Sequence, residues 1–224
     1  MSEIRHLVWD WNGTLLDDQL LVVEALNAVM ADRGLPPTDL ATYQRLYTRP
    51  VKVFYERLFE RSIPEDEWDL LDDVYHRGYK DALERARLAV DAEVALEQVA
   101  GLGRSQSLLS MYRHHELLPL VQRLGIEDRF VRIDGLRGPG GGPKAPHLEA
   151  HLEHVMPLTN SAPEQVLVVG DAIDDAIAAA HVGARCVLYD GGSHPRAELE
   201  AVGVPVVDTL TEALEVGGLG QSVA

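Results

Sequence analysis

Six short apolar segments constrain the fold of this chain more than any other feature of its sequence. Continuous apolar runs of this length, rich in β-branched residues, are typical of strands buried on both faces of a sheet. Helical patterns follow most of these runs, and the alternation predicts an α/β fold: a Rossmann-like parallel sheet with helices on both faces. The predicted strands span residues 4–9, 105–109, 130–133, 166–169, 185–188 and 204–207, and the predicted helices span residues 116–124, 147–155, 174–181, 195–201 and 209–216.

One stretch interrupts this alternation directly after the first predicted strand. It offers no convincing strand, and prolines or a glycine separate its helical patterns at residues 20–32, 40–47, 51–61 and 65–87. An all-helical block at this place predicts an inserted domain. We therefore expect an α/β core domain formed by residues 1–16 and 93–224, interrupted by an all-helical cap domain at residues 17–92.

The composition excludes several classes of protein. The 224 residues include 20 lysines and arginines against 36 aspartates and glutamates, a net charge of −16. This argues against nucleic acid or an anionic membrane as a partner, since both require a basic face. Cys186, the single cysteine, excludes an internal disulfide and lies in an apolar run, which predicts a buried structural thiol. No apolar run approaches the ~20 residues that span a bilayer and no signal peptide is recognisable, so we expect a cytoplasmic protein.

Carboxylates follow two of the predicted strands. Asp10 ends the first strand, Asp171 follows the apolar run at residues 166–169, and Asp175 lies four residues further on. Because the carboxyl ends of parallel strands meet at one edge of a sheet, we expect these side chains to gather there. They would repel one another unless a cation joined them, and Mg²⁺ prefers oxygen ligands. Taken alone, Asp10 fits a helix cap, a nucleophile or a metal ligand, and Asp174 is favoured as a partner of the helix dipole.

Four motifs resemble those of the haloacid dehalogenase-like (HAD) superfamily, most of whose members are Mg²⁺-dependent phosphatases. Residues 10–14 match its Asp-x-Asp-Gly-Thr motif with one departure, and Ser110 closes an apolar segment as the Ser or Thr of its second motif does. Lys144 resembles its loop lysine, and residues 170–175, followed by an Ala-rich helix, match its Gly-Asp-x-x-x-Asp motif. The helical insertion matches the cap of these enzymes, and the chain resembles the phosphoglycolate phosphatase-like group among them.

The resemblance implies a Mg²⁺ cofactor and the residues that hold it. The carboxylates of Asp10 and Asp171, with the backbone carbonyl of Asn12, would bind the metal. Asp175 would support the metal site from its outer shell. Mg²⁺ retains several waters in such sites, so few protein ligands suffice.

The resemblance also implies how a phosphate group would be held. Asp10 would attack phosphorus and form a phosphoenzyme, while Ser110 and Lys144 would hold phosphate oxygens. Thr14 adds a hydroxyl and an N–H near the same strand end and is a further candidate for binding substrate. Phosphoryl transfer needs positioning and charge neutralisation more than proton chemistry, which agrees with these residue types.

Asn12 is the departure from the first motif. In the phosphatases of the family this position is an Asp that protonates the leaving group and later activates water. Asn cannot shuttle a proton, and the loss of a general acid–base typically costs ~10²–10⁴-fold in rate. We therefore expect an enzyme that hydrolyses a phosphoric monoester of a small metabolite, with its turnover weakened by Asn12.

Other functions stay open at this stage. Asn12 also fits a catalytically silent protein that binds a phosphorylated ligand, or a regulatory protein. A phosphomutase, which needs a long-lived phosphoenzyme, is a further alternative. A C–halogen hydrolase of the same superfamily is disfavoured by Asp171 and Asp175, since that chemistry needs no metal. The sequence names no particular substrate, and it fits a monomer as well as a homodimer.

Basic residues of the predicted cap form a weaker signal. Arg49 and Lys52 flank Pro50 between two predicted helices. In an acidic protein they are candidates for binding a second anionic group of the substrate. Ordinary surface charge is the alternative.

Histidines form two further patterns. The histidines at positions 147, 151 and 154 share one face of a predicted helix, where a solvated or packed face is favoured over a transition-metal site. Arg113, His114 and His115 follow Ser110 closely. One of them could replace the missing proton carrier, although a role at a loop or helix start is favoured.

Overall fold

The chain forms two compact units that are discontinuous in sequence. The computed structural model describes residues 2–48, 50–138 and 142–220. The first unit, here the core unit, comprises Met1–Leu16 and Leu88–Ala224, and the second, the helical unit, comprises Asp17–Arg87. The sequence places the return to the core at residue 93. The structure places it at Leu88, because strand β3 (Arg87–Leu88) already pairs with β2 (Leu16–Asp17) and Ala89 N–H donates to the carbonyl of Leu15 at 2.9 Å.

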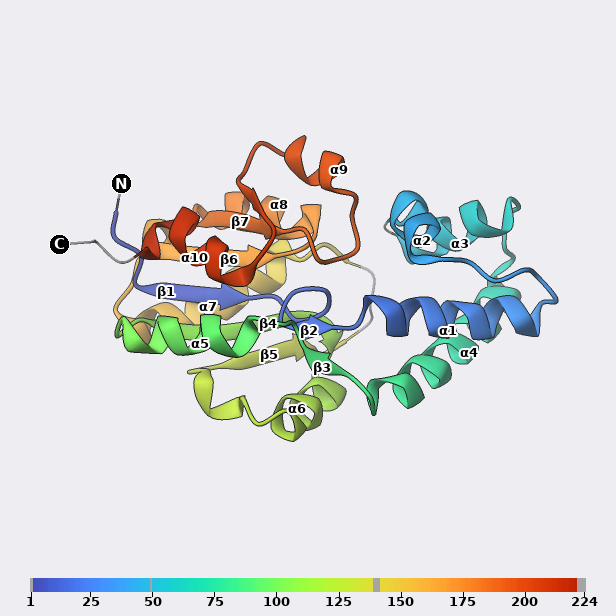
Figure 1. Ribbon diagram of the computed structural model, residues 1–224, viewed down its shortest axis with the longest axis horizontal. Helices are drawn as coiled ribbons and strands as arrows, with labels where there is room; N and C mark the ends of the chain where they lie inside the picture. Colours follow the sequence, from blue (N-terminus) through green and yellow to red (C-terminus); the bar gives the residue numbers. More distant parts are fainter. Residues whose placement is uncertain (1, 49, 139–141, 221–224) are drawn as a thin grey trace. The chain divides into compact units, whose positions relative to one another are not determined.

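A six-stranded sheet of parallel strands forms the centre of the core unit (Figure 1). Its order is β5-β4-β1-β6-β7-β8, so β1 lies between the two halves of the sheet. Trp9, the last residue of β1, is in register with Leu108 on one side and Val169 on the other. The strands are β1 (His6–Trp9), β4 (Ser105–Arg113), β5 (Ile133–Leu136), β6 (Val166–Gly170), β7 (Arg185–Tyr189) and β8 (Val206–Val207).

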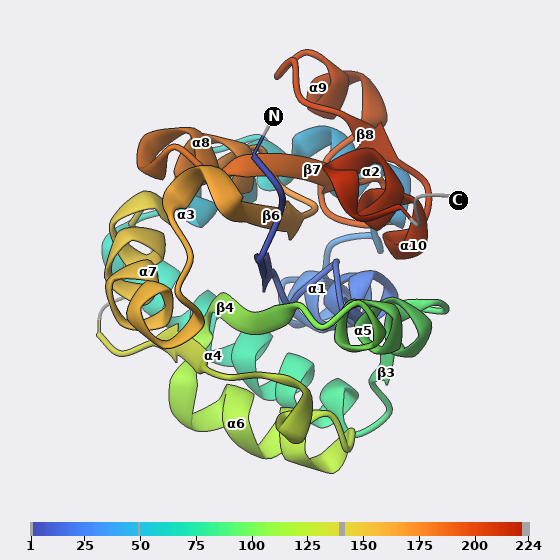
Figure 2. The same cartoon turned by 90° about the vertical axis from the view of Figure 1, so that its left-hand side faces the viewer.

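Helices cover both faces of this sheet, which confirms the predicted fold class. Figure 2 shows α7 and α8 on one face and α5 and α10 on the other. Helix α6 packs against β4 and β5. The helical segments of the core unit are α5 (Ala92–Gly101), α6 (His114–Arg123), η1 (Glu127–Arg129), α7 (Ala145–Thr159), η2 (Pro163–Gln165), α8 (Ile173–Val182), α9 (Arg196–Glu200), α10 (Leu210–Leu214) and η3 (Glu215–Leu219).

Two elements of the core unit differ from the sequence expectation. The strand predicted at residues 130–133 is observed as Ile133–Leu136, because Val131 reaches β4 only through a backbone hydrogen bond to the carbonyl of Gln106 (2.9 Å) and the ladder begins at Ile133. Helix α5 was not predicted. Its buried residues, Ala92, Ala95, Leu96 and Val99, do have the spacing of an amphipathic helix.

The apolar core lies between the sheet and its helices. On one face, side chains of β1, β4, β6 and β7 pack against α7 and α8, and Leu148, Val168 and Leu188 are at most 1% exposed. Leu167, on the alternate side of β6, is fully buried as well. Strands buried on both faces account for the continuous apolar runs in the sequence. The Cys186 thiol lies inside this core, where burial raises its pKa.

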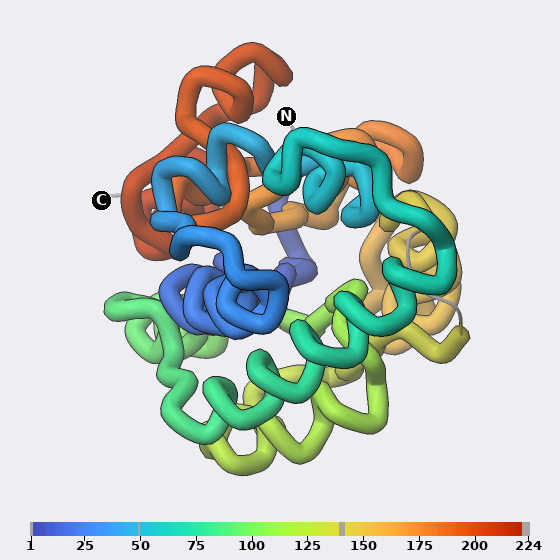
Figure 3. Tube along the Cα trace, turned by 90° about the vertical axis from the view of Figure 1, so that its right-hand side faces the viewer, coloured from blue at the N-terminus to red at the C-terminus, as the bar shows by residue number. Residues whose placement is uncertain are grey.

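The helical unit contains α1 (Gln19–Asp32), α2 (Leu40–Leu46), α3 (Val51–Phe59) and α4 (Glu65–Leu83). Helices α1 and α4 pack against each other, as Figure 3 shows. Aromatic rings fill much of its core: Phe54 contacts Tyr43 and Tyr55 edge to face, with ring centroids 5.5 and 5.4 Å apart. The unit therefore has a hydrophobic core of its own. Among the described residues, no helix combines the length and apolar character needed to span a bilayer.

Candidate active site

The carboxyl ends of β1 and β6 bring two distant aspartates to the same edge of the sheet. Asp10 N–H donates to the carbonyl of Val169 at 2.8 Å, so the ladder between the two strands continues to Asp10. Asp171 follows β6 after Gly170, and Asp175 lies in the first turn of α8. Parallel strands that share one edge thus place residues of remote sequence position together.

A buried acidic cluster results. One carboxylate oxygen from each of Asp10, Asp171 and Asp175 lies within 4.8 Å of the others, and all three residues are buried. The ammonium of Lys144 forms ion pairs with Asp10 and with Asp175, the latter at 2.5 Å. Three carboxylates against one ammonium leave two negative charges in a buried site. A divalent cation would balance them, and a set of oxygen ligands suits Mg²⁺.

Two glycines give the aspartates the space they occupy. A Cβ at Gly170 would lie 2.3 Å from the carboxyl group of Asp175. A Cβ at Gly192 would lie 1.9 Å from the Oδ2 atom of Asp171. Both distances are far below van der Waals contact, so only glycine fits these positions without displacing a carboxylate.

Backbone and hydroxyl donors orient two of the carboxylates. Asp171 accepts hydrogen bonds from Ser193 N–H at 2.9 Å and from the Thr14 hydroxyl at 3.3 Å. Asp175 accepts one from Ala172 N–H at 3.0 Å, on the oxygen that does not contact Lys144. Each oxygen of Asp171 and of Asp175 thus contacts a donor of the chain.

Burial and charge act in opposite directions on the central ion pair. Burial raises the pKa of Asp10 to about 6, although Lys144 acts to lower it. Burial also acts to lower the pKa of Lys144, but Asp10 and Asp175 raise it above its ordinary value. Lys144 therefore remains a cation near neutral pH, and a further positive charge beside Asp10 would favour its ionised form.

The predicted phosphate-binding serine lies beside Asn12. Ser110 is 2% exposed and its hydroxyl donates to the Asn12 side-chain oxygen at 3.4 Å. Tyr112 N–H donates to the same hydroxyl at 2.9 Å, which holds the serine in place. The end of β4 thus reaches the turn after β1, next to the acidic cluster.

Asp174 has a role that its sequence position did not reveal. Its Oδ2 accepts the backbone N–H of Lys144 at 3.0 Å, at the start of α7. The sequence favours a simple interaction with the helix dipole, whereas the structure adds an anchor for the residue whose ammonium enters the acidic cluster. The backbone N–H of Ser193 is a second contributor that the sequence did not indicate, because a main-chain donor carries no side-chain signature.

Two basic residues of the cap, Arg49 and Lys52, are predicted to bind substrate. Lys52 forms an ion pair with Glu65 within the helical unit. Arg49 lies outside the described residues. Their assignment to substrate binding stays a prediction.

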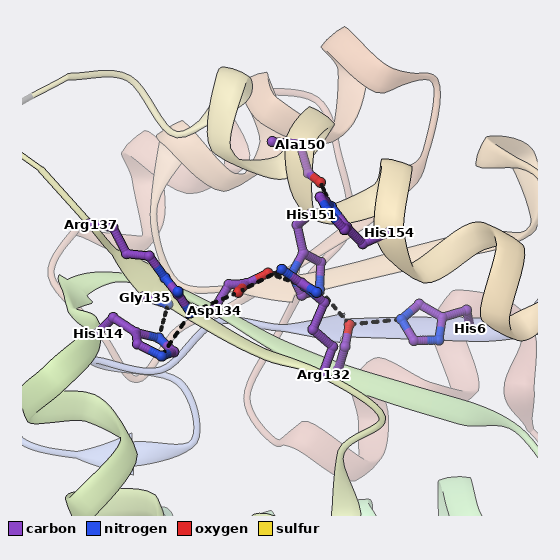
Figure 4. Close-up of polar contacts among 10 residues, drawn as sticks. His6, His114, Arg132, Asp134, Gly135, Arg137, Ala150, His151 and His154 are labelled. Atoms are coloured by element: carbon purple, nitrogen blue, oxygen red, sulfur yellow. Dashed lines mark hydrogen bonds and ion pairs between the residues drawn. The ribbon is translucent and has the colours of Figure 1, made fainter.

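The three histidines of α7 do not form a metal site. His151 is 1% exposed and turns into the core, whereas the exposed His154 contacts the backbone carbonyl of Ala150 at 2.8 Å (Figure 4). Among the described residues, Asp10, Asp171 and Asp175 form the one group of three potential metal ligands.

A buried polar chain runs through the core unit next to the sheet (Figure 4). His151 Nδ1 lies 2.8 Å from Asp134, and its Nε2 lies 2.8 Å from the Ser107 hydroxyl. Ser107 also lies 2.8 Å from His6 Nε2. A carboxylate can only accept, so His151 donates from Nδ1, Ser107 donates to His151, and His6 donates to Ser107. This order resembles a Ser-His-Asp triad, but Ser107 is fully buried and no substrate can reach it.

The buried histidines predict a loss of stability at acidic pH. Burial, reinforced by His151, lowers the pKa of His6 to about 3, whereas a free histidine has a pKa of 6.5. The unfolded chain therefore binds the proton more readily, and the free energy of unfolding falls as the pH drops from 6.5 toward 3, by at most about 1.4 kcal/mol per pH unit. Denaturant melts at several pH values measure this slope.

Replacement of His6 tests whether this histidine causes the loss of stability at acidic pH. His6→Gln removes the titrating group, so its stability should depend less on pH between 6.5 and 4 than that of the parent. The matched control is His154→Gln, because His154 is exposed and should leave the slope unchanged. Equal slopes in all three proteins would show that His6 does not titrate in this way.

The fold and the acidic cluster define an α/β protein whose candidate site lies at the carboxyl edge of a parallel sheet. Comparison with known proteins agrees: the model of the haloacid dehalogenase-like hydrolases matches residues 4–183, and the chain belongs to this family. Phosphoglycolate phosphatase 1 of Pseudomonas aeruginosa is 25% identical over 219 residues, covering 94% of this chain and 78% of that protein.

Two further relatives extend this comparison. Phosphoglycolate phosphatase of Chromobacterium violaceum is 27% identical over 204 residues, covering 86% of this chain and 87% of that protein. A haloacid dehalogenase-like hydrolase of Streptococcus pneumoniae has the same fold, with a TM-score of 0.81 at 20% identity over 96% of this chain and 99% of that one. The similarity spans both units of the chain.

Proposed function

We propose that this protein is a Mg²⁺-dependent phosphatase of a small phosphorylated metabolite, with phosphoglycolate as the first substrate to test. The observation that carries the proposal is the buried cluster of Asp10, Asp171, Asp175 and Lys144, with its two uncompensated negative charges. The names of the relatives, phosphoglycolate phosphatases at 25–27% identity, support the choice of substrate.

The metal would be held by oxygen atoms of the first and fourth motifs. The carboxylates of Asp10 and Asp171 would bind it together with the backbone carbonyl of Asn12. Asp175 would support the site by holding the Lys144 ammonium beside it. When bound, Mg²⁺ would neutralise charge on the phosphoryl oxygens.

The protein side chains would then carry the reaction in two steps. In the first, an oxygen of Asp10 attacks phosphorus and the bond to the leaving-group oxygen breaks, giving an aspartyl-phosphate and an alcohol that takes a proton from solvent. In the second, water attacks phosphorus, inorganic phosphate leaves and the Asp10 carboxylate is restored. Lys144 and Ser110 would hold phosphoryl oxygens during both steps.

Asn12 would slow this cycle. Its side chain can donate and accept hydrogen bonds but cannot deliver a proton to the leaving group or remove one from water. The contact with Ser110 is compatible with positioning, not with proton transfer. Asn12 also favours a second candidate function, a silent protein that binds the phosphorylated ligand without hydrolysing it.

Phosphate release separates the two candidates. We expect release from phosphoglycolate or p-nitrophenyl phosphate with Mg²⁺, and none after removal of divalent ions with EDTA, because the excess negative charge of the cluster would then repel the substrate. Readdition of Mg²⁺ should restore the rate. Saturable binding of phosphoglycolate without any release of phosphate would instead establish the silent binder.

Metal binding should also stabilise the fold. Mg²⁺ binds the folded cluster and not the unfolded chain, so saturating Mg²⁺ should raise the melting temperature. Asp171→Asn removes one ligand and should abolish most of this rise, whereas the matched control Asp190→Asn, which alters an aspartate outside the cluster, should retain it. An equal rise in both variants would place the metal elsewhere.

A further inference from the structure

A basic pocket lies in the core unit, apart from the acidic cluster. It has a volume of about 400 Å³ and lies where β4 and β5 end. Four of its lining residues are basic, in a protein whose net charge is −16. No residue of the cluster of Asp10, Asp171, Asp175 and Lys144 lines it among the described residues. Its described lining consists of Arg113, His114, His115, Leu136, Arg137 and Gly138.

The hydrogen bonds of His114 leave two donors facing each other. Gly135 N–H donates to His114 Nδ1 at 3.1 Å, so this nitrogen carries no hydrogen and the neutral ring carries it on Nε2. Arg137 Nη2 lies 2.8 Å from that Nε2 (Figure 4). A guanidinium can only donate, so two N–H groups meet without an acceptor between them. An oxyanion beside them would accept from both.

Protonation of His114 does not remove this conflict. Burial and the nearby Arg137 lower the pKa of His114, which favours the neutral ring at pH 7. An added proton would only bring a further donor to a ring whose Nδ1 already accepts from Gly135. The same Arg137 Nη2 lies 3.6 Å from Asp134 Oδ1, which is longer than a hydrogen bond, and this carboxylate already contacts Arg132 and His151. Asp134 therefore does not supply an acceptor within hydrogen-bond distance of the two facing donors.

The start of α6 adds main-chain donors to the same place. The helix of 10 residues begins at His114, and its N-cap Arg113 supplies no side-chain acceptor for the first-turn N–H groups. Such a helix start favours a negative charge. Arg113 itself is exposed and, within the described part of the chain, makes no ion pair.

We propose that this pocket binds a small oxyanion, a phosphate or carboxylate group, beside the facing N–H groups of His114 and Arg137 at the start of α6. Planar guanidinium groups and an imidazole N–H match the oxygens of either group. The site is independent of the proposed phosphatase activity, because it uses none of the residues assigned to that reaction. In a strongly acidic protein it provides a local positive region for an anionic effector or product.

The His114 side chain is a local reporter for the test. Histidine resonances of the ¹³C-labelled protein are followed by NMR at constant ionic strength and with EDTA present, and the His114 signal is identified by its loss in His114→Gln. Inorganic phosphate and acetate are titrated separately. We expect a saturable shift of the His114 signal with at least one of them, and the stronger response names the preferred group.

Three variants make the result specific. Arg113→Gln and Arg137→Gln should each weaken the response, with Kd rising about tenfold or more because a charged donor is lost. Both side chains are exposed, so their replacement leaves the core intact. Arg129→Gln, an exposed arginine of η1 paired with Glu97, is the matched control and should keep the parent affinity. The absence of a saturable His114 shift, or an unchanged Kd in both pocket variants, would overturn the proposal.

Discussion

Asp10→Asn should lower the rate of phosphate release by at least about 10⁴-fold, because it removes the oxygen nucleophile that the proposed reaction needs. The change is nearly isosteric and leaves the backbone hydrogen bond of residue 10 to Val169 in place. Steady-state release of phosphate from phosphoglycolate or p-nitrophenyl phosphate measures the loss. A chemical trap for the aspartyl-phosphate should label the parent and not the variant.

The same substitution should not destabilise the metal-free protein. It removes one of three carboxylates from a buried cluster that holds a single ammonium, so repulsion within the cluster decreases. Thermal melts with EDTA should therefore show an equal or higher melting temperature. Asp190→Asn, the matched control outside the cluster, should retain full activity. Residual turnover of the Asp10 variant within tenfold of the parent would rule out Asp10 as nucleophile.

Asn12→Asp should raise turnover by about 10²–10⁴-fold, the usual contribution of a general acid–base. The new carboxyl group can protonate the leaving group and then activate water, which the amide cannot do. Because Ser110 already donates to the Asn12 side-chain oxygen, an aspartate keeps this contact. The gain should appear in kcat and in the rate at which the aspartyl-phosphate is hydrolysed.

An exposed asparagine far from Asn12 in sequence provides the matched control for Asn12→Asp. Asn160→Asp changes an exposed asparagine of the core unit in the same way and should leave the rate unchanged. If Asn12→Asp leaves turnover unchanged in a protein that is active, another group carries the proton. If parent and variant both bind phosphoglycolate but neither releases phosphate, the protein is a binding protein.

Much of the fold is readable in the sequence because burial on both faces leaves a local pattern. The runs that became β6 and β7 are continuous and apolar, and their boundaries agree with the structure to within one residue. Strand β5 was harder to locate, since it contains Asp134 and Gly135 and starts where the apolar run ends. Helix α5 is absent from the sequence prediction although its buried residues follow helical spacing.

The buried histidines show the limit of local patterns. The spacing of residues 147, 151 and 154 indicates a shared helix face but not that His151 alone enters the core. Its partners, Ser107 and Asp134, lie 44 and 17 residues away, on two different strands. Nothing in the sequence around Ser107 or Asp134 indicates that either residue contacts His151.

The sequence by itself determined which side chains stand at strand ends, since a strand's own residues decide where its apolar run stops and a carboxylate begins. That pattern is sufficient to predict Asp10 and Asp171 at one edge of the sheet. Only the tertiary structure decided that Lys144, 134 residues from Asp10, enters between the carboxylates, and that Gly192 leaves room for Asp171. The physical reason is that hydrogen bonds, ion pairs and close contacts depend on distances in space, and residues remote in the chain carry no local record of them.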